Sequence, residues 1–446
     1  MVQPTVGEFE RPIAGEVILP DNPEYSRARN VLSRMGSPAA IVRVKDTGDI
    51  VAAIRFARDN HLNLSVRSGG HHASGLSTND GGVVIDLSHF NNVEVLDASR
   101  RIVRIGAGAR WGDAAQALAA SGLAISSGDT STVGVGGLTL GGGMGWMVRK
   151  YGLTIDNIEG AELVTADGRI LRVNAAEHPD LFWAIRGGGG NFGVITSFDF
   201  RAQPVTSVVG GMVTYDIAEM TPVLTKWAAY MRSAPEELTT MLVIFPGFGP
   251  EPTPQLMLLL CYVGDDEAAA DAVVQPLLKI GTPLHEDVKR MPYHKMLEEP
   301  MEFPGVKPIS DNGFIKTLDE EAIAAIAANY GRQGTPVLQL RSLGGAMGRV
   351  EPEATAFAHR EYEAFVLAAS IVPIDTPAEQ ANQIREDAWR PLKPFTSGAY
   401  INFQSDVSAE STAIAYPPAT YARLARVKAV YDPDNVFNQN HNIKPS

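Results

Sequence analysis

Two histidines in a glycine-dense segment carry the most chemistry in this sequence. His71 and His72 follow Gly69 and Gly70 directly, and the short apolar run 64–66 precedes them. A glycine-rich turn after a strand exposes successive backbone N–H groups with no Cβ in the way, which suits a pyrophosphate. An imidazole beside such a loop can transfer a proton, bind a metal or bond covalently to a cofactor. A tight turn with a surface histidine is the alternative interpretation of this segment.

Two further glycine clusters follow, at 134–145 and 187–193. The first of these lies between strand-like segments, as the histidine segment does, so both are expected to be phosphate-binding loops. A nicotinamide-binding Rossmann motif needs G-x-G-x-x-G at a strand-to-helix turn, with an acidic residue about 20 positions later. The spacing does not fit, because the cluster continues into the glycine triplet 141–143. The sequence therefore disfavours a nicotinamide dehydrogenase.

Composition narrows the class of protein further. The 446 residues include 38 basic and 51 acidic side chains, and this balance argues against a nucleic-acid partner or an anionic membrane surface. The single cysteine, Cys261, lies in the apolar run 258–263, so we expect a buried strand residue, no internal disulfide and no cysteine-based zinc site. The segment 1–11 has no apolar leader, and no apolar window spans a membrane, so a cytoplasmic protein without a bound metal is expected.

The order of expected elements predicts an α+β fold. Apolar residues at 50, 51, 54 and 57 follow the helical period, with Asp46 or Thr47 as N-cap. Asp167 and Gly168 predict a hairpin between two strands. After residues 202–204 the glycine clusters stop and longer strands begin, which indicates a domain boundary. The later strands are expected at 212–215, 242–245, 255–263, 339–343 and 365–371, and the later helices at 220–232, 265–278, 377–390 and 418–430.

Five collinear motifs, which span nearly the whole chain, resemble FAD-dependent oxidoreductases of the vanillyl-alcohol-oxidase type. Within that family, the chain is similar to the branch of berberine-bridge enzymes and bacterial 6-hydroxynicotine oxidases. The resemblance implies a PCMH-type FAD-binding domain at 1–205, an inserted substrate-binding domain at 206–399, and a berberine-bridge-like segment at 400–446 that returns to the FAD domain. The inserted domain is expected to have an antiparallel sheet backed by helices. The motifs lie at 67–71, 132–143, 151–157, 182–194 and 431–443.

The same resemblance implies that FAD is joined covalently to His71. His72 is the competing attachment residue, and the position directly after the two glycines favours His71. Thr130 stands where bicovalent members of the family carry a cysteine, so attachment through one histidine is expected. The resemblance implies FAD contacts, with Val194 at the adenine and an asparagine of the tail near the flavin. The cofactor-binding residues predicted besides His71 are Arg67, Ser68, Gly69, Gly70, His72, Gly128, Asp129, Val133, Gly134, Gly137, Gly142, Gly145, Val194, Asn440 and Asn442.

Departures from the family pattern concern the substrate. Val133 occupies the position that resembles the oxygen gate of the family, where a small aliphatic side chain favours an oxidase. Met144 stands where many relatives have a tyrosine base, and the strand 365–369 is apolar where plant relatives carry Glu or Gln. The remaining candidates for catalytic residues are Tyr400 and Asn402, which match a Tyr-x-Asn-Tyr motif. As members of a strand they would share the face toward the flavin.

A site with few bases favours a particular substrate class. An alcohol normally needs a base to accept its proton, whereas a neutral amine can release a hydride unaided. We therefore predict an oxidase that removes hydride from a C–H next to an amine or alcohol of a small aromatic or heterocyclic substrate. Oxygen is the expected acceptor and hydrogen peroxide the product. The alternatives are an oxidase of a sugar or secondary-metabolite alcohol and a flavin-binding protein with little turnover. The protein is expected to be a monomer or a homodimer.

Overall fold

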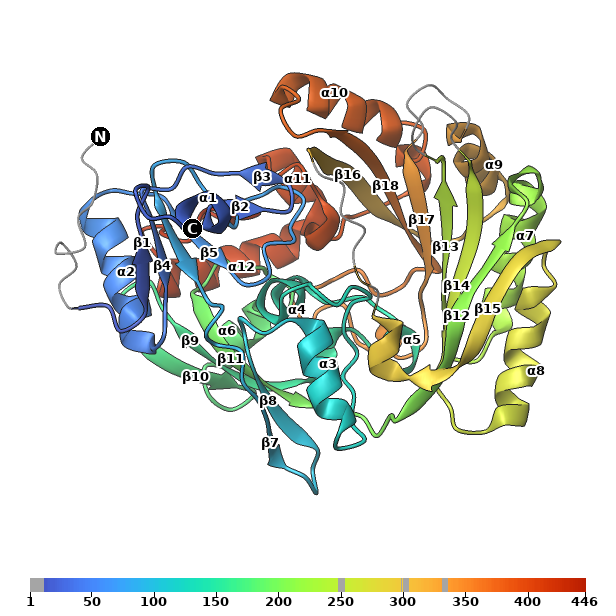
Figure 1. Cartoon of the computed structure of the whole chain (residues 1–446), viewed down its shortest axis with the longest axis horizontal. Coiled ribbons are helices and arrows are strands. Elements are labelled where there is room, and N and C mark those ends of the chain that lie inside the picture. Colours follow the sequence, from blue (N-terminus) through green and yellow to red (C-terminus); the bar gives the residue numbers. More distant parts are fainter. Residues whose placement is uncertain (1–11, 248–252, 298, 300–304, 331–335) are drawn as a thin grey trace.

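The chain folds around three main β-sheets, shown in the computed structural model in Figure 1. The structure describes residues 12–247, 253–297, 299, 305–330 and 336–446. The expectation that residues 1–11 contain no apolar leader concerns a segment outside these residues. No helix in the described ranges is long and apolar enough to cross a membrane.

The two smaller sheets lie in the N-terminal half of the chain (Figure 1). In the first sheet β4, β6 and β5 are parallel and β1 is antiparallel; in the second sheet all neighbouring strands are antiparallel. The first sheet has the order β1 (Glu16–Ile18), β4 (Ala40–Arg43), β6 (Val83–Asp86) and β5 (Leu64–Arg67). The second has the order β10 (Ile170–Asn174), β9 (Ile158–Val164), β11 (Val194–Arg201), β8 (Ile102–Gly106) and β7 (Val93–Asp97). A short ribbon pairs β2 (Asn30–Val31) with β3 (Arg34–Met35).

Local signals fix the helices beside these sheets. The Asp46 side chain accepts a hydrogen bond from Asp49 N at 2.8 Å and so caps the N-terminus of α2, as its sequence predicts. The hairpin predicted at Asp167 and Gly168 joins β9 and β10. The helices of this part are α1 (Tyr25–Ala28), α2 (Thr47–Asp59), α3 (Trp111–Ala119), α4 (Val135–Gly141), α5 (Val148–Tyr151) and α6 (Pro179–Ala184), with the 3-10 turn η2 (Thr154–Asn157).

The third sheet is fully antiparallel and has seven strands. Its order is β15 (Pro283–Pro292), β12 (Ser207–Tyr215), β14 (Gln255–Tyr262), β13 (Leu238–Phe245), β17 (Val337–Ser342), β18 (Ala364–Pro373) and β16 (Val306–Ile315). Its elements are joined through α7 (Met220–Ser233), α8 (Glu267–Leu278), α9 (Glu320–Asn329), α10 (Ala378–Trp389) and the 3-10 turns η3 (Ile217–Glu219), η4 (Tyr293–Met296), η5 (Met347–Arg349) and η6 (Lys393–Phe395).

Alternation along the strands gives this large sheet two apolar faces. On β18, Val366 and Ala368 belong to the core that contains α7, α8 and α9, whereas Phe365 and Leu367 belong to the core shared with the N-terminal half. Cys261 of β14 is fully buried, as predicted. The sheet is therefore covered by helices on one face and turns the other toward the glycine clusters.

The C-terminal helices return to the N-terminal half, where Figure 1 shows α11 and α12 beside the elements of the two smaller sheets. The last elements are η7 (Ile401–Phe403), α11 (Ala409–Ala415) and α12 (Pro418–Tyr431). This arrangement is the predicted α+β fold with a two-part FAD-type region and a helix-backed antiparallel sheet. The residue boundaries 1–205, 206–399 and 400–446 are retained as a proposal.

Two local predictions were wrong. Residues 401–403 form a 3-10 turn and not a strand, because backbone bonds close from Phe403 N to Tyr400 O and from Gln404 N to Ile401 O. The second glycine cluster is not an open loop, because Val135–Gly141 forms helix α4. Glycine lowers helix propensity, and here packing between neighbouring segments outweighs that cost.

Candidate functional site

A cavity of about 420 Å³ opens where the glycine clusters, the C-terminal tail and the large sheet meet. The glycine clusters and the neighbouring loops contribute Val66, Ser68, Gly69, Gly70, His71, His72, Gly128, Asp129, Thr130, Val133, Gly134, Gly136, Gly137, Leu138, Leu140, Met144, Gly189, Gly190, Asn191 and Gly193. The tail, η7 and the large sheet contribute Pro308, Ser310, Leu367, Ala369, Tyr400, Ile401, Asn402, Phe403, Gln439, Asn440 and His441.

The first two glycine clusters are in backbone contact at this cavity. A Cβ added to Gly134 would lie 2.2 Å from Gly69 N, so neither position accommodates a side chain without moving the other segment. The Ser68 hydroxyl donates to Ala107 O at 2.6 Å and accepts from Gly136 N at 3.3 Å. The third cluster joins them through Gly189 N, which donates to Leu140 O at 3.1 Å. The three clusters therefore form one continuous wall.

The two histidines of the first cluster have different surroundings. His72 is engaged at both ring nitrogens: Nε2 lies 2.8 Å from Ile401 O, and Nδ1 lies 2.6 Å from the Ser74 hydroxyl. The His71 ring lines the cavity and makes no hydrogen bond to any described residue. Burial, aided by the charge of Arg110, lowers the pKa of His71, so its ring is neutral at neutral pH. Of these two adjacent histidines, only His71 has a ring without a hydrogen bond to the described residues, so the prediction that it is the attachment residue stays open to test.

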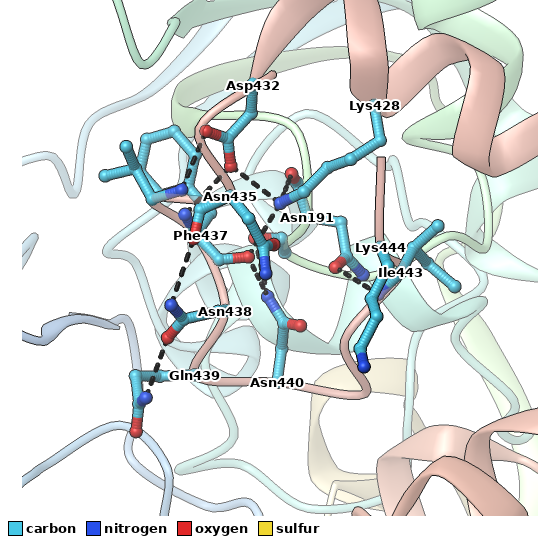
Figure 2. Close-up of polar contacts among 12 residues, drawn as sticks. Asn191, Lys428, Asp432, Asn435, Phe437, Asn438, Gln439, Asn440, Ile443 and Lys444 are labelled. Carbon is cyan, nitrogen blue, oxygen red and sulfur yellow. Dashed lines mark hydrogen bonds and ion pairs between the residues drawn. The ribbon is translucent and has the colours of Figure 1, made fainter. Parts of the chain in front are cut away.

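The tail is held in place by a buried ion pair, shown in Figure 2. Lys428 and Asp432 are both fully buried, and Nζ lies 2.6 Å from Oδ2. Nζ also donates to Asn191 O at 2.7 Å and to Phe437 O at 2.8 Å. Asp432 accepts from the backbone N–H of Phe437 at 2.9 Å. This cluster, the Lys428–Asp432 clamp, fixes the tail on the third glycine cluster.

Beyond the clamp, amide side chains carry the tail along the cavity. Asn440 Nδ2 donates to Gly190 O at 3.0 Å, and Asn191 Nδ2 donates to His441 O at 3.1 Å (Figure 2 shows Asn191 and Asn440). Asn191 Oδ1 accepts from Ile443 N at 3.0 Å. The asparagine tail is thus packed into the structure, one of the two alternatives that its sequence leaves open.

Several polar atoms at this wall have no protein partner. Asn440 Oδ1 and both ring nitrogens of His441 are buried and make no hydrogen bond with the described residues. Buried polar groups are almost always hydrogen-bonded, so these atoms indicate a polar ligand. A Cβ added to Gly137 or Gly190 would meet nothing within 4 Å, so the backbone there borders open space. The cavity has the donors, acceptors and open backbone that a large polar cofactor requires.

His441 makes the stability of the protein depend on pH. Burial first, and then the nearby His72 ring, lower the pKa of His441 to about 3, although the Ile401 carbonyl opposes this. The unfolded chain takes up a proton below about pH 6.5 that the folded chain refuses until about pH 3, so stability falls across this interval. Urea unfolding should therefore show that the free energy of unfolding falls between pH 7.5 and pH 5 in the wild type. In His441→Gln this fall should be smaller by about 2 kcal/mol. Identical pH dependence in the two proteins contradicts this assignment.

Tyr400 and Asn402 lie together, but their polar groups serve the protein wall. The Tyr400 hydroxyl accepts from Gly143 N at 2.9 Å and from Asn402 Nδ2 at 2.8 Å, and Asn402 Nδ2 also donates to Leu138 O at 3.0 Å. Burial raises the pKa of Tyr400 to about 12 despite these donors. A neutral phenol is a poor base, and the prediction of Tyr400 and Asn402 as catalytic residues stays a prediction. The pair instead contacts Leu138 in the middle of α4 and Gly143 just beyond its C-terminus.

Most predicted cofactor residues line the cavity, and five do not. Arg67 is buried beside Asp86 at 2.7 Å and donates to Ala28 O, so its guanidinium positions the first cluster from behind. The four others outside the cavity lining are Gly142, Gly145, Val194 and Asn442. His441 and Ser310 line the cavity and were not predicted. The histidine within the asparagine tail was a usable signal for the first, and only the register of β16 reveals the second.

The end of the cavity formed by the large sheet is mainly apolar, with Ser310 and the carboxylate of Asp129 as its polar groups. Leu367 and Ala369 of β18 and the ring of Phe403 line it, with Met144 from the second cluster. β18 carries no Glu or Gln, so none projects from this strand into the cavity. Asp129 lies 2.5 Å from Arg341 Nη2 of β17 at this end.

The fold and the cavity define a flavoprotein of the two-domain oxidase type. Residues 38–174 match the FAD binding domain family, and residues 399–444 match the berberine and berberine-like family. The chain is 31% identical to (R)-6-hydroxynicotine oxidase of Paenarthrobacter nicotinovorans over 97% of both chains. The chain belongs to the family of FAD-linked oxidoreductases related to berberine-bridge enzymes and is an FAD-dependent oxidase.

Two solved structures share the fold. The crystal structure of 6-hydroxy-D-nicotine oxidase from Arthrobacter nicotinovorans superimposes with a TM-score of 0.87 at 31% identity, covering 97% of this chain and 98% of that one. Glucooligosaccharide oxidase of Acremonium strictum gives a TM-score of 0.83 at 24% identity, covering 97% of both chains, and its FAD is described as 6-S-cysteinyl, 8α-N1-histidyl. The buried acceptors of the tail and the open glycine backbone fit FAD as the cofactor of this chain.

Proposed function

We propose that this protein oxidises a small aromatic or heterocyclic amine or alcohol at the C–H beside its nitrogen or oxygen. Bound FAD would accept the hydride and pass two electrons to O2, which yields hydrogen peroxide. The observation that carries the proposal is the apolar end of the cavity, bordered by Leu367, Ala369, Phe403 and Met144. Such walls bind a flat apolar body and exclude water around the reacting C–H.

The chain's own residues have distinct tasks in this proposal. His71 would hold FAD covalently, and Gly69, Gly134, Gly137 and Asn440 would line its binding site. The single cysteine of the chain, Cys261, is buried in the large sheet and does not line the cavity, so one histidyl link and no cysteinyl link is proposed. This contrasts with the cysteinyl and histidyl links named for glucooligosaccharide oxidase.

Apart from the carboxylate of Asp129, which is paired with Arg341, the cavity has few candidate bases, and this favours amines over sugars. Tyr400 is held neutral by burial, and His72 and His441 are buried rings whose pKa values are lowered. A sugar hydroxyl needs a strong acceptor for its proton, whereas a neutral amine needs only correct orientation. The relative named (R)-6-hydroxynicotine oxidase acts on a heterocyclic substrate and supports the same class.

The test is oxygen consumption and peroxide release by the purified yellow protein. A panel of benzylic amines, N-heterocyclic amines, benzylic alcohols and oligosaccharides is added in air. We expect oxygen uptake with one peroxide per substrate for an amine or aromatic alcohol. Bleaching of FAD by substrate without peroxide would reveal a dehydrogenase. Turnover of oligosaccharides alone would establish the sugar alternative, and no bleaching with any compound would leave a flavin-binding protein.

A further inference from the structure

Asp129 is the single carboxylate among the described residues that line the cavity, and no lysine or arginine is among them. Its side chain is 17% exposed, although Arg341 lies 2.5 Å from its Oδ2. The other oxygen, Oδ1, accepts from the Thr130 hydroxyl at 3.1 Å. A carboxylate offers about four acceptor positions, so this one retains capacity toward the cavity.

The register of the large sheet aims Arg341 at the same region. Arg341 of β17 is paired with Phe365 of β18, and Gln339 is paired with Leu367. Directly paired residues project from one face of a sheet, and Leu367 lines the cavity. Arg341 therefore rises from the face of the sheet that borders the cavity.

The guanidinium is held from three parts of the chain. It lies 5.1 Å from the centre of the Phe403 ring, and its two terminal nitrogens donate to Met144 O at 3.4 Å and to Gln339 Oε1 at 3.2 Å. The Arg341 side chain is only 8% exposed. These contacts leave the guanidinium little freedom, so they fix the carboxylate of Asp129 as well.

We propose that Asp129 is the substrate anchor, which accepts a hydrogen bond from the N–H or O–H next to the reacting C–H, and that Arg341 is its positioning residue. This inference rests on the proposed function and gives it a charge preference. Ammonium and neutral donor groups match the carboxylate, whereas a carboxylate substrate lacks a donor and meets a like charge.

Replacing Asp129 and replacing Arg341 should change the charge of the cavity wall in opposite directions. Asp129→Asn leaves Arg341 without its anion, so the wall becomes positive and attracts anions. Arg341→Met leaves the carboxylate unpaired, so the wall becomes negative. The double variant has neither charge, and removing both partners of a buried pair is better tolerated by the fold than removing one.

The experiment titrates the anaerobic holoenzyme with benzylamine, benzyl alcohol and benzoate at pH 7.5. Binding is recorded as the immediate change in the flavin absorption spectrum, before any bleaching. Asp129→Asn should weaken the binding of benzylamine at least about tenfold and strengthen the binding of benzoate about tenfold. These are the effects expected for a charge-assisted hydrogen bond. The dissociation constant of benzyl alcohol should change less than that of benzylamine. The double variant should bind neither charged probe preferentially.

A matched control removes another buried ion pair between the same two parts of the chain. Asp156 accepts hydrogen bonds from both terminal nitrogens of Arg360, at 2.8 and 2.9 Å. Neither residue lines the cavity. Asp156→Asn should leave the ratio of the benzylamine and benzoate dissociation constants unchanged. Equal ratios in the wild type, Asp129→Asn and the double variant, or an absence of binding in all of them, overturn the anchor. Failure of the wild type to release peroxide with any substrate would instead overturn the proposed function.

Discussion

Replacement of His71 with alanine is expected to abolish acid-stable flavin: on acid precipitation, all FAD absorbance should pass to the supernatant. The reason is that the neutral His71 ring lines the cavity without a hydrogen bond to the described residues, while both nitrogens of the adjacent His72 are engaged by Ile401 and Ser74. The variant should be isolated as apoprotein or with reversibly bound FAD and should oxidise substrate more slowly. The measurement is the flavin absorbance of pellet and supernatant, together with the reduction potential of reconstituted protein, which should be lower.

Two further histidines serve as controls for this experiment. His72→Ala should keep acid-stable FAD, because it removes a hydrogen bond and no attachment. The exposed His89 lies on the same stretch of chain, and His89→Ala should behave as the wild type. Acid-stable FAD in His71→Ala would place the attachment at another residue.

Replacement of Lys428 with methionine destabilises the protein by about 3–5 kcal/mol, because Asp432 is left as a buried charge without its cation. The ion pair is fully buried, and Nζ also satisfies the carbonyls of Asn191 and Phe437. Loss of the clamp should free the tail, so flavin fluorescence should rise as the wall with Asn440 and His441 opens. Urea unfolding and the fluorescence of the folded protein measure both effects.

The loss of stability in Lys428→Met should be much larger than the loss caused by removing an exposed lysine. Lys444 of the same tail is exposed, and Lys444→Met should change stability by less than about 0.5 kcal/mol. The double variant Lys428→Met with Asp432→Asn should recover part of the loss, since no unpaired charge remains. A change in Lys428→Met as small as that in Lys444→Met would contradict the role assigned to the clamp.

The first glycine cluster could be recognised in the sequence because its signals are local. Gly69, Gly70 and His71 are adjacent, and glycines at a close backbone approach have no substitute, as the contact between Gly69 and Gly134 shows. The apolar run 365–369, which has no Glu or Gln, is likewise a local signal, although only the structure shows that Leu367 and Ala369 border the cavity. Features of this kind require only the neighbouring residues and a strand period.

Other parts of the site depend on tertiary structure that no local pattern encodes. Tyr400 and Asn402 share a side of the chain through the 3-10 turn η7, which Asn312 of β16 fixes by donating to Tyr400 O and accepting from Tyr400 N. Arg341 reaches Asp129 only through the register of the large sheet. The low pKa of His441 arises from burial by segments distant in sequence. Such long-range juxtapositions cannot be read from spacing.

The most direct test of the account is a tryptic peptide map of the wild-type protein. Cleavage after Arg67 and Arg100 isolates one peptide that contains both His71 and His72. We predict that this peptide carries the mass of one FAD, that fragmentation assigns it to His71, and that no second site is modified. FAD on His72, or a yellow protein whose peptides are all unmodified, would contradict the histidyl attachment at the centre of the account.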